Sequence, residues 1–216
     1  MVAPRAKQEA VKRYGGSIVL CEPTIEAREA ALARLLADEG AIPIHPYNDL
    51  MVMAGQGTLA LELLEQVPEL QSIVCPVGGG GLLAGVSVGA SAVRGDVRVF
   101  GVEPAAADDA ARSLACGHIV PSGNPTTLAD GLRASLGPLT FPVIAKHAAG
   151  ITAVSEEGIV RAMRLAFEVL KIVIEPSAAV GLAALLERQL DVRGGQIAVV
   201  LTGGNLDLDR LPWMSR

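Results

Sequence analysis

Four consecutive glycines follow a short apolar run in residues 72–85, SIVCPVGGGGLLAG, and a run with helical character comes after them. Glycine tolerates positive φ angles and lets a ligand approach the backbone closely, so several main-chain N–H groups can converge on one point. The positive end of the following helix favours a negatively charged group there. A tight turn alone rarely needs four glycines, and the segment therefore predicts a phosphate-binding loop.

The same glycine run also fits a dinucleotide-binding loop. Gly79, Gly81 and Ala84 have the spacing G-x-G-x-x-A, and Glu103 stands at about the distance where a ribose-binding acid is expected. On these residues alone, an oxidoreductase that uses a nicotinamide or flavin cofactor is therefore an alternative hypothesis.

A second strand-like run ends in glycine at residues 197–207, IAVVLTGGNLD. Ligands of open α/β sheets bind beyond the carboxyl ends of the strands, so Thr202 and Asn205 would line the same crevice as the four glycines. A hydroxyl at a strand end can equally satisfy a neighbouring backbone group, and this structural role for Thr202 stays open.

Three acids, Glu103, Asp108 and Asp109, stand close together in the sequence GVEPAAADD. With a backbone carbonyl between them, they could offer hard oxygen ligands to Mg²⁺, Mn²⁺ or Ca²⁺. Taken alone, the pattern more often marks a solvated helix start with an aspartate cap. The histidines are scattered and no nucleophile motif is found, so a hydrolase triad is not supported.

The elements that must position these residues alternate between short aliphatic runs and longer runs of helical periodicity. This alternation is typical of a parallel sheet covered by helices on both faces, so we predict an α/β fold with a twisted parallel sheet. The predicted strands are 17–20, 41–44, 72–76, 98–102, 150–154 and 196–201. The predicted helices are 5–14, 25–39, 50–66, 82–93, 107–116, 156–170 and 176–189.

A change of pattern near residues 46–49, where Pro, Tyr, Asn and Asp interrupt the apolar runs, predicts a domain boundary. Only two predicted strands precede it, which is too few for an independent doubly wound domain. We therefore expect residues 1–46 to be the remnant of a small domain and residues 47–216 to form the core of a large one.

The composition excludes several classes of protein. The 216 residues carry a formal net charge of −5 and only 3% are aromatic, so nucleic acid has little to bind. The first residues are too polar for a secretory signal, and the apolar runs are broken well before the roughly 18 residues that a membrane helix needs. We therefore expect a cytoplasmic protein without a nucleic-acid or membrane partner.

Seven segments in this order resemble the serine/threonine dehydratase and serine racemase family, whose cofactor is pyridoxal phosphate. Single segments are weak signals, but seven in one order are highly specific. The resemblance implies a fold-type II architecture similar to the tryptophan synthase β chain, with the large domain binding the cofactor. The segments are YGGSIVLCEP, HPYND followed by AGQGTLALE, VGGGGLLAG, GVEPAAADD, TLADGL, IEPSAAVGLAALL and VLTGGNLDL.

The resemblance also implies roles for individual residues. Those that would hold the cofactor phosphate are Gly78, Gly79, Gly80, Gly81 and Leu82. Thr202 would be the neutral partner of the pyridine nitrogen, with Asn205 beside it, and Glu175 is similar to a glutamate near the cofactor. Arg28 matches a position implicated in substrate contact. The divalent-cation site for Mg²⁺ or Mn²⁺ would be formed by Glu103, the carbonyl of Ala107 and Asp109.

The chain departs from the family in its N-terminal part. There the family carries the Schiff-base lysine and a Ser-x-Gly-Asn loop, and neither is found in this sequence. The lysines, at positions 7, 12, 146 and 171, all lie in helix-like contexts. By comparison about 100 residues are absent, a typical domain-scale segment. A truncated gene, a misplaced start codon and a split enzyme with a separate N-terminal segment as partner are the alternatives. In each case we expect a fragment that is inactive by itself and a homodimer in the complete enzyme.

The function implied by the resemblance is that of a pyridoxal phosphate-dependent ammonia-lyase, which converts L-serine or L-threonine to the 2-oxo acid and ammonia. Serine racemase shares all of these motifs and is the nearest alternative. A nucleotide-dependent oxidoreductase leaves the TGGN segment unexplained. A non-catalytic remnant with an exposed apolar face is the remaining alternative, favoured by the absent lysine.

Overall fold

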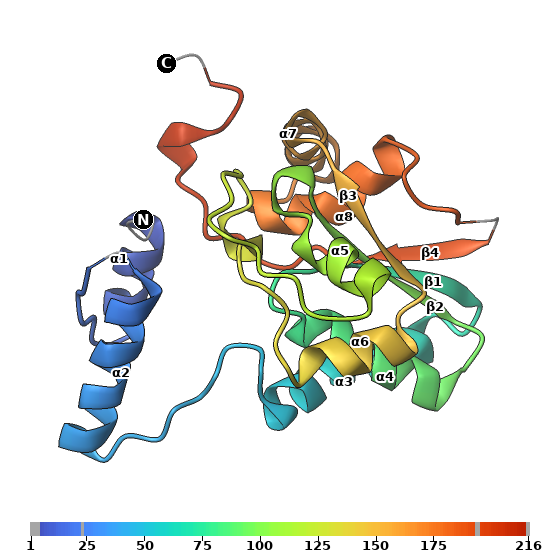
Figure 1. Cartoon of the computed structure of the whole chain (residues 1–216). Coiled ribbons are helices and arrows are strands. Elements are labelled where there is room, and N and C mark those ends of the chain that lie inside the picture. The colour runs from blue at the N-terminus through green and yellow to red at the C-terminus, as the bar shows by residue number, and fades with distance from the viewer. Residues whose placement is uncertain (1–4, 23, 193–194, 215–216) are drawn as a thin grey trace. The chain divides into compact units, whose positions relative to one another are not determined.

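The computed structural model of the protein describes residues 5–22, 24–192 and 195–214, which form two compact units (Figure 1). The first unit comprises Met1–Ile44 and Asn205–Arg216, and the second comprises His45–Gly204. Residues 205–216, which we expected in the large domain, therefore group with the first unit.

The second unit is built on a sheet of four parallel strands in the order β3-β2-β1-β4. The strands are β1 (Leu70–Pro76), β2 (Arg98–Pro104), β3 (Gly150–Val154) and β4 (Gln196–Val199). The two central strands are aliphatic and almost entirely buried, as expected for a sheet covered on both faces. The α/β fold and these four predicted strands are confirmed.

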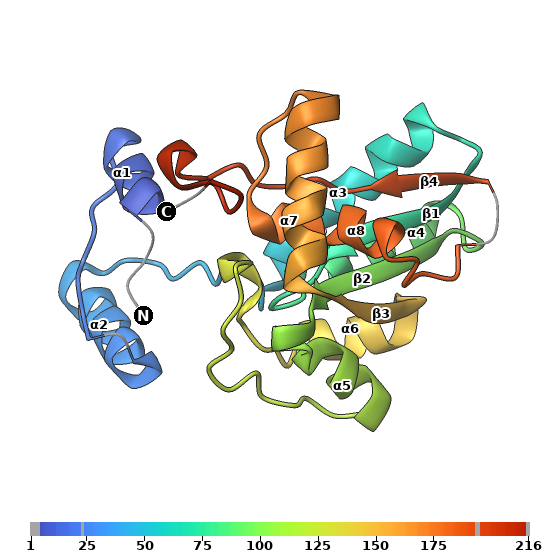
Figure 2. The same cartoon turned by 90° about the horizontal axis from the view of Figure 1, so that it is seen from above.

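Helices cover both faces of this sheet, as Figures 1 and 2 show. One face carries α7 (Glu156–Leu165) and α8 (Pro176–Leu186), whereas α5 (Asp109–Cys116) packs beside β3. The other face carries α3 (Leu50–Gln66), α4 (Gly81–Val93) and α6 (Thr140–His147). None of the described helices is long and apolar enough to cross a membrane.

Helix α4, which carries the glycine run at its start, is fixed by close backbone contact with α3. A Cβ on Gly85 would lie 2.2 Å from the carbonyl oxygen of Met53, and a Cβ on Gly89 would lie 2.6 Å from that of Gly57. Glycines at these positions let the two backbones touch, so α4 is a rigid support for the loop that precedes it.

Two helices differ most from the prediction, while the others keep their predicted places to within three residues at each end. The eight residues of α6 were not predicted as a helix, but its Pro142 is the third helical residue, where the missing N–H costs no helical hydrogen bond. Helix α7 was predicted to continue to residue 170. It ends at Leu165 and passes into a π-helical turn, Ala166–Leu170, which Lys171 terminates with φ 60°.

The first unit contains α1 (Arg5–Arg13) and α2 (Ile25–Glu39) but no strand among its described residues. The predicted strands 17–20 and 41–44 are therefore wrong. Both segments are irregular, and their apolar side chains other than the half-buried Ile18 are exposed, with Leu20 at 81% and Ile42 at 87%. A strand needs a neighbour that completes its main-chain hydrogen bonds, and the described residues supply none to these segments.

Candidate functional site

The glycine loop joins β1 to α4 at the carboxyl end of the sheet. β1 ends at Pro76, α4 begins at Gly81, and Gly80 at the cap of the helix has φ 92° and ψ −3°. The N–H of Ala84 makes the first hydrogen bond of the helix, to the carbonyl oxygen of Gly80 at 2.9 Å. The N–H groups of residues 78–82 donate to no other described residue. Because they lie at the positive end of α4, they can bind an anion.

Neighbouring groups pack directly against the backbone of this loop. A Cβ on Gly79 would lie 2.3 Å from the ring of Tyr47, and a Cβ on Gly81 would lie 3.0 Å from the Cα of the same residue. A Cβ on Gly78 would lie 3.0 Å from the Cα of Leu132. The loop therefore presents bare main-chain N–H groups, and it fits the phosphate of the cofactor that the resemblance implies.

The turn after β4 lies at the same end of the sheet, because β4 is the parallel neighbour of β1. Thr202 in this turn is exposed, and Gly203 has φ 85°. The carbonyl oxygen of Gly203 accepts a hydrogen bond from the N–H of Glu175 at 3.1 Å. A Cβ on Gly203 would lie 2.7 Å from Oε1 of Glu175, so this glutamate packs against the turn.

Another segment, from the connection between β2 and β3, joins these turns. The N–H of Gly131 donates to the hydroxyl of Ser177, in the first turn of α8, at 3.0 Å. The carbonyl oxygen of Gly131 would lie 3.1 Å from a Cβ on Gly78. The glycine loop, residues 131–132, the start of α8 and the turn after β4 therefore converge at one end of the sheet, where ligands of such sheets bind.

The second unit thus brings together most of the predicted cofactor-binding residues. The glycine loop, Glu175 and Thr202 all lie at this end of the sheet. Arg28 and Asn205 belong to the first unit, so the second unit by itself does not contain them.

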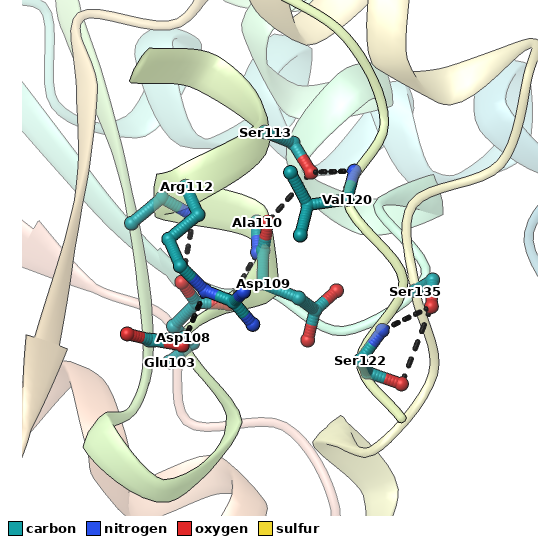
Figure 3. A network of polar contacts seen from close by, with 10 residues as sticks. Glu103, Asp108, Asp109, Ala110, Arg112, Ser113, Val120, Ser122 and Ser135 are labelled. Atoms are coloured by element: carbon teal, nitrogen blue, oxygen red, sulfur yellow. Dashed lines mark hydrogen bonds and ion pairs between the residues drawn. The ribbon is translucent and has the colours of Figure 1, made fainter. Parts of the chain in front are cut away.

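The predicted cation site lies where β2 meets α5 (Figure 3). Glu103 is 1% exposed, and its carboxylate oxygens accept hydrogen bonds from the N–H groups of Ala110 at 3.1 Å and Ala111 at 2.7 Å. Asp109 is 2% exposed, and its Oδ2 is buried without a hydrogen-bond partner among the described residues. Asp108 instead pairs with Arg112 on the surface, at 2.7 Å.

Burial governs the charge of both inner carboxyls. It raises the pKa of Glu103 to about 8, and the carboxylates of Asp109 and Asp108 add to the rise, while the two main-chain N–H groups oppose it. Burial also raises the pKa of Asp109 to about 6, against its own main-chain N–H and the nearby Arg112, which lower it. Within the described ranges, no three His, Cys, Asp or Glu side chains gather as metal ligands. The buried carboxyls therefore need a proton or a cation beside them.

The sequence pattern did not predict several residues that shape the glycine loop. These are Tyr47, Asn48, Leu132, Thr140 and Ser177. Their contacts join segments 32 to 91 residues apart, from Tyr47 and Gly79 to Asn48 and Leu139, which no local pattern reveals. Four of the five lie in the family-like segments HPYND, TLADGL and IEPSAAVGLAALL, but the resemblance assigned them no role, and residues 46–49 were interpreted as a domain boundary.

Comparison with known proteins gives a consistent picture. The family model described as "Pyridoxal-phosphate dependent enzyme" matches residues 2–203. The chain is 46% identical, over 98% of its length, to the β-hydroxyaspartate dehydratase of Paracoccus denitrificans (strain Pd 1222). It is 43% identical, over 97% of its length, to the serine racemase of Arabidopsis thaliana.

Solved structures show the same similarity. The structure of maize serine racemase matches 96% of this chain with a TM-score of 0.93 and 43% identity. The structure of a threonine deaminase from T.th. matches 94% with a TM-score of 0.89 and 42% identity. The chain spans 64–67% of the length of these four relatives.

Gly80 offers a test of the loop's conformation. We expect Gly80→Ala to destabilise the chain by about 1–3 kcal/mol, because the backbone is strained for alanine at positive φ. The new Cβ would also lie 2.8 Å from atoms of Leu136, Thr140 and Ile144. Gly123→Ala is the matched control, since Gly123 has φ 69° with no atom within 4 Å of a Cβ. Urea denaturation should show a larger loss for Gly80→Ala, and equal losses would contradict the crowding.

The two buried acids Glu103 and Asp109, which we call the acid pair, predict how the free energy of unfolding depends on pH in EDTA. Between pH 4.5 and 8, folded Glu103 retains a proton that the unfolded chain has released, so the free energy of unfolding falls as pH rises. The slope from this group is at most about 1.4 kcal/mol per pH unit. Glu103→Gln should remove most of the slope above pH 7, where Asp109, with its pKa at about 6, has released most of its proton. Parallel pH curves for the two proteins would contradict this account.

Proposed function

The chain belongs to the family of pyridoxal-phosphate dependent enzymes, and from this premise we propose that it serves the dehydration of β-hydroxy amino acids, with L-serine and L-threonine as substrates. The observation that carries the proposal is the set of similar proteins. Relatives above 40% identity are named for β-hydroxyaspartate, serine and threonine, and all three amino acids carry a hydroxyl on the β-carbon. The earlier oxidoreductase hypothesis loses its support, because this family uses pyridoxal phosphate.

In this proposal, residues of the second unit hold different parts of the cofactor. Pyridoxal phosphate, when bound, withdraws electrons from the α-carbon of an amino acid. The N–H groups of residues 78–82 would hold the phosphate, and the hydroxyl of Thr202 would serve as a neutral partner for the ring nitrogen. A ring whose nitrogen faces a hydroxyl would withdraw fewer electrons from the α-carbon than a ring whose protonated nitrogen faces a carboxylate. This weaker withdrawal suits loss of a β-hydroxyl group. Glu175 supports the Thr202 turn through its contacts with Gly203.

Serine racemisation is the second candidate function. Its support is that several of the similar curated proteins and the maize structure are named serine racemase, at 43% identity. The residues of the glycine loop and the Thr202 turn serve either reaction equally, so only the product distinguishes them.

The described residues of the second unit place no lysine at the glycine loop that could form the Schiff base with the cofactor. On α6, Thr140 is the residue that contacts the glycine loop, and Lys146 lies six residues further along. The backbone of Lys146 is therefore about 9 Å from that of Thr140 along the helix axis. Lys171 donates through Nζ to the carbonyl oxygen of Glu168, within its own turn, at 2.6 Å. The proposal therefore includes a polypeptide segment that supplies this lysine. From the family resemblance and the composition, it also includes a homodimeric complete enzyme and a cytoplasmic location.

A divalent cation is also part of the proposal. Mg²⁺ or Mn²⁺ would be held by the carboxylates of Glu103 and Asp109 and the carbonyl of Ala107, which are hard oxygen ligands. Its support is the buried Oδ2 of Asp109, which has no hydrogen-bond partner among the described residues, beside a second buried carboxyl. A cation would replace the protons that burial otherwise retains on these groups.

The activity of the chain tests the proposed reaction. We expect the purified 216-residue chain with pyridoxal phosphate to convert L-threonine to 2-oxobutanoate no faster than the free cofactor, because losing the covalent lysine removes several orders of magnitude in rate. Coexpression with the lysine-bearing N-terminal segment of a related dehydratase should restore turnover of L-threonine or L-serine. A segment whose lysine is changed to alanine is the control.

Product analysis then separates the candidates. Formation of 2-oxo acid and ammonia supports the dehydratase, and formation of D-serine without 2-oxo acid would favour the racemase instead. Turnover of β-hydroxyaspartate alone would contradict the choice of serine and threonine. Turnover by the chain without any added segment would overturn the need for a supplied lysine.

The cation site predicts a metal-dependent melting temperature. Millimolar Mg²⁺ should raise the melting temperature of the wild-type chain by mass action and leave that of Asp109→Asn unchanged. Asp108→Asn is the matched control, because Asp108 pairs with Arg112 at the surface and should not affect the response. The site would be excluded if Mg²⁺ stabilised wild type and Asp109→Asn equally in differential scanning fluorimetry.

A further inference from the structure

Thr140 is a buried threonine that connects α6 to the glycine loop. It is 0% exposed, and its hydroxyl donates to the carbonyl oxygen of Gly79 at 2.8 Å. The hydroxyl oxygen of Thr140 in turn accepts a hydrogen bond from the N–H of Gly137 at 2.9 Å. We propose that Thr140 is the positioning residue of the phosphate loop, which fixes the peptide group between Gly79 and Gly80. This inference rests on the proposed function, in which that loop binds phosphate.

Peptide geometry makes the hydrogen bond directional. The peptide group is planar and trans, so the carbonyl of Gly79 and the N–H of Gly80 point in opposite directions. With the carbonyl turned toward Thr140, the N–H of Gly80 is turned away from it and remains available to an anion. That N–H makes no hydrogen bond to any other residue in the described part of the chain.

Glycine on both sides of this peptide makes an external contact necessary. Glycine populates positive and negative φ about equally, so neither Gly79 nor Gly80 restricts the rotation of the peptide between them. Gly80 is held at φ 92°. A hydrogen bond to a rigid partner is therefore the simplest device that selects one orientation.

The hydroxyl of Thr140 has one proton and two nearby carbonyl acceptors. The oxygen of Gly79 lies at 2.8 Å and that of Gly137 at 3.1 Å. The N–H of Gly137 donates to the hydroxyl oxygen at 2.9 Å and also, over a longer 3.3 Å, to the carbonyl oxygen of Gly79. The hydroxyl proton is therefore directed to a carbonyl, and Gly79 receives its shorter hydrogen bond from Thr140.

Thr140 is itself held in place by its surroundings. The Oδ1 of Asn48 accepts a hydrogen bond from the N–H of Leu139 at 2.8 Å, and a Cβ on Gly137 would lie 2.4 Å from the same atom. One turn along α6, Ile144 is fully buried where α6 packs against α4. The threonine therefore has little freedom to follow a rotating peptide.

A purely structural threonine would behave differently. Loss of its hydroxyl would lower the free energy of unfolding but leave the folded protein's affinity for phosphate unchanged. A positioning role instead requires that affinity falls in the folded state and that serine, which keeps the hydroxyl, preserves it.

Isothermal titration calorimetry of the 216-residue chain with inorganic phosphate tests the inference. We expect Thr140→Val to weaken binding about tenfold and Thr140→Ser to stay within about twofold of wild type, since one hydrogen bond to an ionised group contributes on this scale. Thr127→Val is the matched control, because Thr127 is 4% exposed and its hydroxyl accepts from the N–H of Ala129 at 3.1 Å, whereas no hydrogen bond joins it to residues 78–82 among the described residues. It should bind phosphate like wild type.

The outcomes distinguish the positioning role of Thr140 from phosphate binding by the glycine loop. Equal phosphate affinity in wild type and Thr140→Val overturns the positioning role and leaves the proposed function standing. Absence of phosphate binding in wild type overturns the phosphate loop, and the positioning role with it. Equal weakening in Thr140→Val and Thr127→Val assigns the effect to general destabilisation and also overturns the inference. If circular dichroism shows that Thr140→Val is unfolded, Thr140→Ala takes its place under the same criteria.

Discussion

The structure depends on keeping the main-chain N–H groups of residues 78–82 free of side chains and of internal hydrogen bonds. Unpaired donors of this kind are costly when they are buried, unless an anion or water completes them. The surrounding packing enforces the arrangement, because Tyr47 and Leu132 contact the glycine backbone and Thr140 fixes one of its peptides. The contact between α3 and α4 supports the helix whose positive end lies at this loop.

The acid pair, Glu103 and Asp109, has the opposite problem, because it buries more hydrogen-bond acceptors than donors. Glu103 obtains two main-chain N–H groups from α5, yet burial still holds its pKa at about 8, and Oδ2 of Asp109 lacks a partner within the described ranges. A cation would satisfy both carboxyls, as an anion would satisfy the glycine loop. Both features begin at the carboxyl ends of the two central strands, so one parallel sheet places the unpaired donors and the buried acids at the same end.

Local sequence patterns predicted the features that depend on local physics. The glycine loop and the four strands of the sheet are in this class, because buried parallel strands read as continuous aliphatic runs. The segments 17–20 and 41–44 have the same composition but find no partner strand among the described residues, and pairing is not a local property. Thr140 was missed for a related reason: its bond to Gly79 spans 61 residues, and the helix that carries it is short and contains Pro142.

Amide NMR of the ¹⁵N-labelled chain during titration with inorganic phosphate tests the central claim most directly. If the glycine loop binds phosphate through its backbone, the largest chemical-shift changes should fall on the amides of residues 78–82, with a common saturation curve. The account would be contradicted by unchanged loop amides at saturating phosphate. It would also be contradicted by changes centred on another part of the second unit, such as the arginines Arg94 and Arg98 at the opposite end of the sheet.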